Sequence, residues 1–233
     1  PIQNNKSNDT GIDLYDFTGK LNKNKPDDSV VISDAGSAYY VCSQATGIKG
    51  KNRYITSSAQ AEMGFTIPAC IGAAFAGSPC VIGVTGDGSF QMNLQELQTI
   101  KHHQLPIKLF VWNNGGYLSI RTTQKKFFEG REIGTDEDSG VSFPDLVRVA
   151  YAYDMDYIKV SDYDSLTPAL QTIFANDDPM IIEVMCQKWQ EVVPTLQGRK
   201  NPDGTISAPP LEDMYPFLSR EEFCDNMIVE TVE

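Results

Sequence analysis

The chain has 233 residues, of which 41% are hydrophobic and 21% are charged. This balance is typical of one large or two small folded domains, and it excludes a disordered or collagen-like chain. The 31 acidic residues outnumber the 19 basic ones and give a formal net charge of −12. Such a surface repels nucleic-acid phosphates and anionic membranes, so we expect neither as a general partner.

The cysteines and the chain start indicate a cytoplasmic protein. Five cysteines, at positions 42, 70, 80, 186 and 224, lie far apart without a CxxC pair, as expected for reduced thiols rather than a disulfide network or a zinc site. The polar N-terminus has no signal-peptide pattern, and because it lacks an initiator Met we leave open whether the chain is cropped. The long charge-free stretch 64–86 contains Pro68, Gly72 and Gly77, which favours a buried helix, a turn and a buried strand over a membrane span.

Along the chain, residues 1–28 are polar and contain one apolar-periodic piece at 12–17, as in a linker that leads into a short helix. Short apolar runs rich in β-branched residues follow at 30–34, 81–86, 107–113, 156–160 and 180–186. Segments with helical period alternate with these runs, such as the one containing Leu94, Leu97 and Ile100. This alternation predicts a three-layer α/β fold over residues 29–188, with a parallel sheet covered by helices on both faces.

The pattern changes after residue 188. Residues 189–233 contain several prolines and turn signals, and we expect a C-terminal tail that packs on the domain. Packing would cover the four large apolar side chains Leu211, Met214, Tyr215 and Phe217. A second polar segment, residues 129–140, is acidic; we expect a mobile solvent loop, with a lid that orders over a bound substrate as the alternative.

Small and polar residues follow three of the predicted strands, at 34–37, 86–89 and 113–116. In open α/β sheets ligands bind beyond the carboxyl ends of the strands, where glycines and helix N-termini expose backbone N–H groups to phosphate. Asp87 and Asn114 stand one helix and one strand apart, which brings both to neighbouring strand ends. Their oxygens, with a nearby turn carbonyl, are typical ligands of Mg²⁺.

The segment GDGSFQMNLQELQTIKHHQLPIKLFVWNNGGY resembles the thiamine diphosphate signature, in which GDG is followed about thirty residues later by NN. Upstream, ISDAGSAYYVCSQ and SAQAEMGFTIPACIGAAFAG are similar to the matching parts of the acetolactate synthase, pyruvate decarboxylase and pyruvate oxidase family. The resemblance covers about residues 10–190. It implies the C-terminal, diphosphate-binding domain of such an enzyme, with thiamine diphosphate and Mg²⁺ as cofactors.

The resemblance also implies roles for individual residues. Asp87, the side chain of Asn114 and the carbonyl of Gly116 would ligate Mg²⁺. Met63 would wedge under the cofactor and hold it bent, and the backbone of Ala61 would meet the pyrimidine amino group. The diphosphate contacts would come from seven further residues: Ser37, Ala38, Gly86, Gly88, Ser89, Leu118 and Ser119.

In this family a Glu of a separate pyrimidine-binding domain activates the cofactor, and nothing in the chain matches that domain. We therefore expect the chain to be inactive alone, with the missing domain in the same longer chain or in a separate subunit, and we expect a homo-oligomer. Glu96 is expected to pack or cap rather than catalyse. His102 and His103 are expected at the surface.

The substrate class implied by the resemblance is a 2-oxo acid, which is decarboxylated and whose product can be ligated to a second carbonyl. Thr123 stands where acetohydroxyacid synthases have a Trp, so branched-chain amino-acid synthesis is in doubt. Arg121, Lys125 and Lys126 could meet an anionic substrate, but we expect a solvated basic patch. The alternatives are a β-type subunit of a split decarboxylase and a non-catalytic cofactor-binding module; a nicotinamide-binding domain is disfavoured because no GxGxxG follows the first strand.

Overall fold

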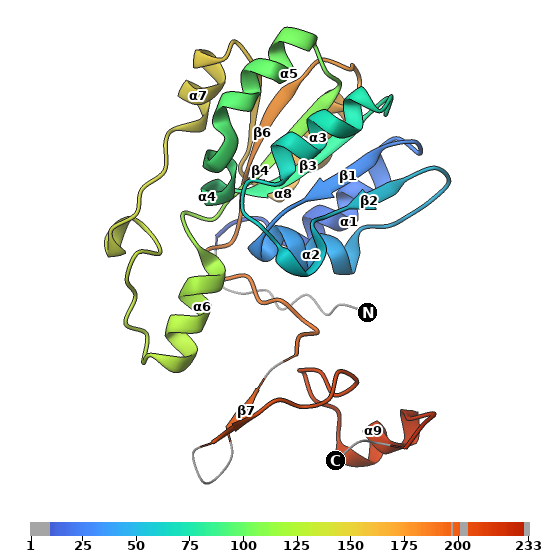
Figure 1. Cartoon of the computed structure of the whole chain (residues 1–233), viewed down its shortest axis with the longest axis vertical. Helices are drawn as coiled ribbons and strands as arrows, with labels where there is room; N and C mark the ends of the chain where they lie inside the picture. The colour runs from blue at the N-terminus through green and yellow to red at the C-terminus, as the bar shows by residue number, and fades with distance from the viewer. Residues whose placement is uncertain (1–9, 197, 201–204, 231–233) are drawn as a thin grey trace. The chain divides into compact units, whose positions relative to one another are not determined.

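The computed structural model describes residues 10–196, 198–200 and 205–230. The chain divides into two compact units, Pro1–Gln190 and Glu191–Glu233. The first unit is built on a six-stranded sheet in the order β2-β1-β3-β4-β6-β5, and all of its strand pairs are parallel (Figure 1). The strands are β1 (Val30–Ser33), β2 (Arg53–Ile55), β3 (Val81–Gly86), β4 (Ile107–Asn113), β5 (Asp156–Val160) and β6 (Met180–Met185).

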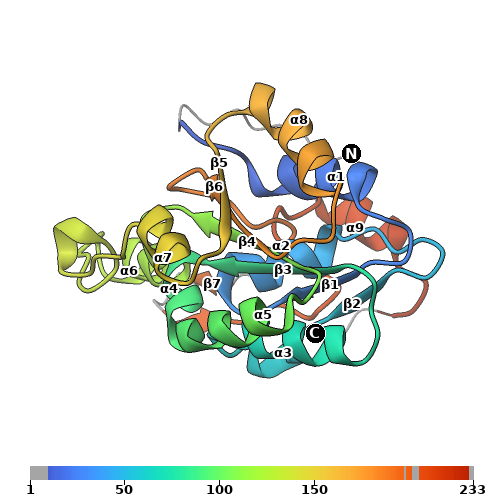
Figure 2. The same ribbon diagram turned by 90° about the horizontal axis from the view of Figure 1, so that it is seen from above.

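Helices cover both faces of the sheet, which confirms the predicted three-layer α/β fold. Helices α1 and α8 lie on one side of the strands, and α3 and α5 lie on the other (Figure 2). Helix α2 packs beside α1, and α7 adds to the face of α3 and α5. The helices of this unit are α1 (Leu14–Asn24), α2 (Gly36–Ala45), α3 (Thr66–Phe75), α4 (Asp87–Phe90), α5 (Leu97–His103), α6 (Leu118–Phe127), α7 (Leu146–Ala152) and α8 (Tyr163–Ile173).

The central strand β4 shows why the apolar runs are nearly continuous. Its alternate residues Leu109 and Val111 belong to the core under α3, α5 and α7. The intervening Phe110 and Trp112 face α1, where the ring of Phe17 meets theirs edge-on at centroid distances of 5.4 and 5.5 Å. Because successive side chains of a strand point to opposite faces, a strand buried on both faces needs apolar residues at every position.

Two elements differ from the sequence expectations in detail. Strand β2 was not predicted, because Arg53-Tyr54-Ile55 is only three residues long. It is also an edge strand, which pairs with β1 alone and is less buried than the inner strands. Helix α1 is the short helix expected after the linker, but it extends beyond the apolar piece 12–17 to Asn24. It begins after Asp13, whose carboxylate accepts hydrogen bonds from the N–H groups of Tyr15 and Asp16.

The second unit is small. It contains the antiparallel pair β7 (Arg199–Lys200) and β8 (Ile206–Ser207) and the helix α9 (Arg220–Asn226). Arg220 donates two hydrogen bonds of 2.9 Å to the carboxylate of Asp213. The packing of this tail on the first unit stays a prediction.

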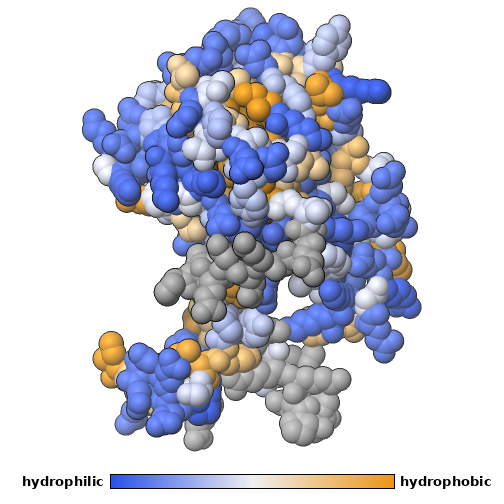
Figure 3. Space-filling view, turned by 180° about the vertical axis from the view of Figure 1, so that it is seen from behind, coloured by the Kyte–Doolittle hydropathy of each residue, from blue (hydrophilic) through white to orange (hydrophobic). Residues whose placement is uncertain are grey.

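The surface seen in Figure 3 is mostly hydrophilic, with apolar side chains in small groups, as the composition leads one to expect. All five cysteines are free thiols, and four of them are buried. None of the helices in the described part of the chain combines the length and the apolar character that a bilayer crossing requires.

Candidate active site

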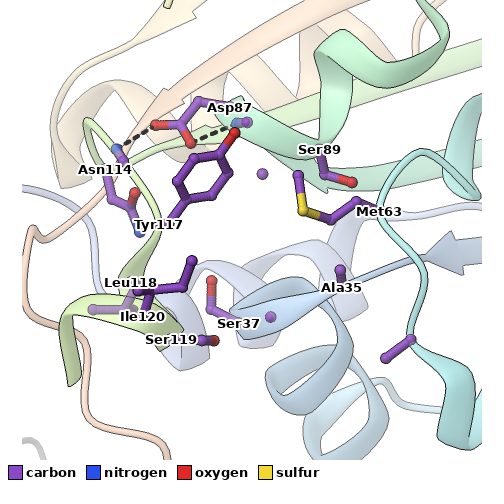
Figure 4. A pocket seen from close by; sticks show the side chains of 15 residues that line it. Ala35, Ser37, Met63, Asp87, Ser89, Asn114, Tyr117, Leu118, Ser119 and Ile120 are labelled. Carbon is purple, nitrogen blue, oxygen red and sulfur yellow. Dashed lines mark hydrogen bonds between the residues drawn. The ribbon is translucent and has the colours of Figure 1, made fainter. Parts of the chain in front are cut away.

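A pocket of about 270 Å³ lies at the carboxyl ends of β1, β3 and β4 (Figure 4). The connection after β1 leads outward to β2, whereas the connection after β3 leads in the opposite direction to β4. This reversal is the topological switch point at which open α/β sheets bind ligands. The lining consists of Ala35, Gly36, Ser37, Ala61, Met63, Gly86, Asp87, Gly88, Ser89, Asn114, Gly116, Tyr117, Leu118, Ser119 and Ile120.

Asp87 is the one carboxylate among the described lining residues, and it is 4% exposed. One of its oxygens accepts a hydrogen bond from the N–H of Gly88 at 2.7 Å, and the other accepts one from the N–H of Gly116 at 3.0 Å (Figure 4). Burial raises the pKa of Asp87 to about 6, although these amide hydrogen bonds oppose the shift. Asp87 thereby ties the turn after β4 to the end of β3.

Asn114 presents a buried oxygen that lacks a donor. Its side-chain Oδ1 has no hydrogen-bond partner among the described residues. An unpaired buried acceptor costs free energy, and in native structures such an atom usually meets a ligand, a water or an ion. Together with Asp87, this oxygen fits a hard cation. No group of three or more His, Cys, Asp or Glu in the described chain is placed to hold a metal ion, so a metal here would take few carboxylate ligands.

The turn between Asn114 and Tyr117 requires glycine. Gly116 has a φ of +149°, and a Cβ there would lie 2.0 Å from the carbonyl oxygen of Thr135. A Cβ on Gly88 would lie 2.3 Å from the ring of Tyr117, which covers this residue. Both glycines therefore allow a close approach that holds the two sides of the pocket together.

Two helices point uncapped N-termini at the pocket. Helix α2 follows Ala35 and helix α6 follows Tyr117, and neither residue caps its helix through a side-chain hydrogen bond. Helices α1, α7 and α8 are capped by Asp13, Asp145 and Asp162, whereas α3, α4 and α5 also lack a side-chain cap. Exposed N–H groups at a helix start carry partial positive charge and bind anions. The pocket can therefore hold an anion although its described lining contains no Lys, Arg or His.

The wall opposite this turn comes from residues 58–64. Ala61 is in the left-handed conformation with a φ of 47°, which is uncommon for a residue with a side chain. Met63 is 38% exposed and points its side chain into the pocket (Figure 4). An exposed Met beside a strained backbone position indicates a segment shaped for a ligand rather than for the core.

A chain of hydrogen bonds, here called the Asp34 clamp, holds this wall in place. Gly64 donates its N–H to Ser89 Oγ at 2.8 Å, and Ser89 donates its hydroxyl to Asp34 at 2.7 Å. Thr85 donates to the same oxygen of Asp34 at 2.9 Å. Asp34 is fully buried, and burial raises the pKa of its carboxyl group. The clamp fixes Gly64, the residue directly after Met63, to the ends of β1 and β3.

The structure brings together nearly all of the site residues predicted from the sequence. The exception is Ala38: it is 1% exposed, belongs to the core and does not line the pocket, because it is the third residue of a helix that begins at Gly36. The sequence placed Asp34 at this edge of the sheet, but no role was predicted for it. Ala35 and Gly36 were likewise placed there without a role, and the lining residues Tyr117 and Ile120 were missed.

The expected basic patch and solvent loop were partly wrong. Lys125 and Lys126 are exposed, but Arg121 is 0% exposed. In the segment 129–140, Thr135 and Asp136 are buried, with Asp136 in an ion pair with Arg121. Arg121 on α6 and Asp136 in the segment 129–140 meet only in the folded chain, so local charge patterns do not reveal their contact.

Other polar residues lie where the sequence suggested. His102 and His103 are exposed at the end of α5. Glu96 accepts a hydrogen bond from Thr99 at 3.0 Å, and neither Glu96 nor Glu62 lines the pocket.

An open parallel sheet with uncapped helix N-termini around a pocket at its switch point defines a domain that binds a phosphorylated ligand. The family model described as "Thiamine pyrophosphate enzyme, C-terminal TPP binding domain" matches residues 34–184. The chain therefore belongs to this family of thiamine pyrophosphate-binding domains, as its sequence motifs predict.

Similar proteins include acetolactate synthases. The chain is 32% identical to the acetolactate synthase isozyme 2 large subunit of Escherichia coli, over 84% of this chain and 34% of that protein. It is 32% identical to the acetolactate synthase large subunit of Lactococcus lactis, over 77% of this chain and 31% of that protein. A solved structure, the thiamine diphosphate-dependent 4-hydroxybenzoylformate decarboxylase of Rhodococcus jostii, matches with a TM-score of 0.69 and 26% identity, over 79% of this chain and 34% of that one. The chain thus spans about a third of the length of these relatives.

We predict that Ser89→Ala lowers the free energy of unfolding by about 1–3 kcal/mol, because the substitution leaves the buried Gly64 N–H and Asp34 carboxylate without their shared partner. Urea denaturation measures the change. Ser37→Ala is the matched control, since Ser37 lines the same pocket outside the Asp34 clamp, and it should change stability by no more than about 0.5 kcal/mol. Equal effects of the two substitutions would show that the clamp does not stabilise the fold.

Proposed function

We propose that the chain is the thiamine diphosphate- and Mg²⁺-binding part of an acetolactate synthase-like enzyme. Its substrate would be a 2-oxo acid, which loses CO₂ and whose remaining fragment can be ligated to a second carbonyl. The main observation behind this proposal is the unpaired Oδ1 of Asn114 beside the buried carboxylate of Asp87, at the end of the sheet where two helices begin uncapped.

In this proposal Asp87, Asn114 and the carbonyl of Gly116 hold Mg²⁺. The metal offsets the negative charge of a diphosphate, which the helix starts at Ser37 and at Leu118–Ser119 also bind. Gly86, Gly88 and Ser89 form the floor at the end of β3. When bound, thiamine diphosphate supplies the electron sink that loss of CO₂ from a 2-oxo acid requires.

The protein's own part in the reaction is orientation. Met63 would support the cofactor from below in a bent shape, with its position set by the Asp34 clamp. The carbonyl of Ala61 would accept a hydrogen bond from the pyrimidine amino group. Met63 and Ile120, 38% and 45% exposed, would give the reacting end an apolar border. An apolar border excludes water, which strengthens electrostatic interactions inside the pocket.

The choice of substrate class rests on the similar proteins. One group is named as acetolactate synthases and another as a decarboxylase of 4-hydroxybenzoylformate, which is itself a 2-oxo acid. The two names differ in the fate of the fragment that remains after CO₂ is lost. We therefore propose decarboxylation as the common step and ligation as the additional one.

We expect Asp87→Ala to weaken Mg²⁺-dependent binding of thiamine diphosphate at least about 100-fold, or about 3 kcal/mol, because it removes the one charged ligand of the proposed metal site. Isothermal titration calorimetry with and without Mg²⁺ measures the affinity for thiamine diphosphate. The substitution is introduced into the same polypeptide that the source cells produce. Asp164→Ala removes an exposed carboxylate in the first turn of α8 and should leave the affinity unchanged. Unchanged affinity in Asp87→Ala would exclude the proposed metal site.

Met63→Ala separates orientation from binding. We expect turnover of a 2-oxo acid to fall about 10²-fold, because the cofactor loses its bent geometry, whereas its affinity changes little. Steady-state kinetics and calorimetry on the same samples provide the two numbers. Met214→Ala, a Met of similar exposure at 40%, is the control. Normal turnover in Met63→Ala would remove the role assigned to this residue.

The pyrimidine-binding domain is proposed to come from the same longer chain or from a partner subunit, and a homo-oligomer would bring such domains together. We expect an antibody against this domain to detect, in blots of source cells, a polypeptide at least about twice the mass of the 233-residue chain, in keeping with the length of the relatives. A band at the mass of the present chain would instead favour a split enzyme or a cofactor-binding module without turnover.

A further inference from the structure

Arg121 is a charged residue in an unusual place. It lies in the first part of α6, directly after the pocket residue Ile120, and its side chain is fully buried. Burying a cation is costly unless other groups compensate its charge. The arrangement therefore requires a set of partners, and these partners show what the residue does.

The guanidinium contacts the turn that contains the proposed metal ligands. Its Nη1 donates to the carbonyl of Gly115 at 3.3 Å, and its Nη2 donates to the carbonyl of Asn114 at 3.3 Å. Nη2 also donates to the carbonyl of Lys188, beyond β6, at 2.9 Å. A planar guanidinium can reach several acceptors in fixed directions, which a lysine cannot do. Arg121 thus orients the two peptide groups that precede Gly116.

Asp136 compensates the charge of Arg121. Its carboxylate lies 3.7 Å from Arg121 Nη1 and 3.0 Å from Lys188 Nζ. Hydrogen bonds from Lys188 and Ser139 lower the pKa of Asp136, so the group is ionised at neutral pH. One carboxylate compensates the buried guanidinium, and Lys188, the second cation that Asp136 contacts, is partly exposed to the screening solvent.

The segment that contains Asp136 also holds the other side of the turn. Tyr117 donates its N–H to the carbonyl of Thr135 at 2.8 Å. Gln124 on α6 binds the backbone of Ile133 through both its amide oxygen and its amide nitrogen, at 2.9 and 3.1 Å. Residues 133–136 are thus fixed to α6 and to the start of that helix.

We propose that Arg121, held in place by Asp136, is a positioning residue that fixes the Asn114–Gly116 turn in the geometry needed for Mg²⁺. The inference depends on the proposed function for its ligand, but the contacts themselves are independent of it. The turn is held at four points: the carbonyls of Asn114 and Gly115 by Arg121, the N–H of Gly116 by Asp87, and the N–H of Tyr117 by Thr135. The carbonyl of Gly116 lies between these points and is therefore aimed by them.

The test uses Arg121→Lys, which keeps the charge but loses the fork of donors, and Asp136→Asn, which is nearly isosteric. The control is Lys108→Met, because Lys108 is another buried cation of the sheet. It is 1% exposed at the start of β4, and it donates to Asn176 at 3.0 Å and to the carbonyl of Asp178. All substitutions are introduced into the same polypeptide that the source cells produce.

Two readouts are compared. The first is the calorimetric affinity for Mg²⁺ in the presence of saturating thiamine diphosphate. The second is hydrogen–deuterium exchange of residues 113–118 without metal or cofactor. We expect Arg121→Lys and Asp136→Asn each to weaken Mg²⁺ binding about tenfold or more and to speed exchange in the turn. Lys108→Met should lower the melting temperature while leaving both readouts at the wild-type level.

Wild-type Mg²⁺ affinity and wild-type exchange in both Arg121→Lys and Asp136→Asn would overturn the inference. So would a loss of affinity that Lys108→Met reproduces at the same decrease in melting temperature. If the wild-type protein itself bound neither Mg²⁺ nor the cofactor, the proposed function would fail, and unchanged exchange in the turn would then still decide against Arg121. Should Arg121→Lys not fold, Asp136→Asn and Ser139→Ala, which removes a partner of Asp136, decide in its place.

Discussion

The buried carboxylate of Asp87 is the constraint on which the site depends. It stands at the end of β3, whose register pairs Gly86 with Trp112 of β4, so the chain that leaves β4 passes directly beside it. The amides of Gly88 and Gly116 compensate part of the cost of burying this charge. In doing so they fix the turn after β4 relative to the start of α4. Without this link, the three groups proposed as metal ligands would belong to two independent loops.

Two further buried charges support the two sides of the pocket. Asp34 holds the side of Met63 through Ser89 and the Gly64 N–H, and Arg121 holds the side of Asn114 through the turn carbonyls. Each charge is fully buried, and each contacts the pocket wall from behind rather than lining it. A buried charge is costly when its partners move away, and this cost favours a single arrangement of the wall. Rigid support of this kind suits a site whose function is orientation.

The sequence was sufficient for those parts of the structure that local patterns determine. Apolar runs such as 107–113 predicted the buried strands, and glycines after three of them predicted which strand ends meet at the pocket. The burial of Arg121 could not be predicted in this way, because its neighbours Thr122, Thr123 and Lys125 are polar and its partners, Asp136 and Lys188, are distant in the chain. Ala38 shows a related limit: its side chain belongs to the core, whereas a contact of its backbone N–H with a diphosphate stays a prediction. A motif identifies the helix that reaches the ligand, but only the start of that helix at Gly36 determines which residue faces the core.

The charges around the pocket also explain why metal and cofactor should bind together. A diphosphate at the starts of α2 and α6 would lie close to Asp87, and two anionic groups in a partly buried site repel each other. A divalent cation held by Asp87 would offset both negative charges, and the unpaired Asn114 Oδ1 would offer it a neutral oxygen. Neither ligand alone would be compensated, because the described lining has no Lys, Arg or His to neutralise the diphosphate and one carboxylate is a weak site for a metal. By linkage, each ligand should therefore raise the affinity for the other by the same factor.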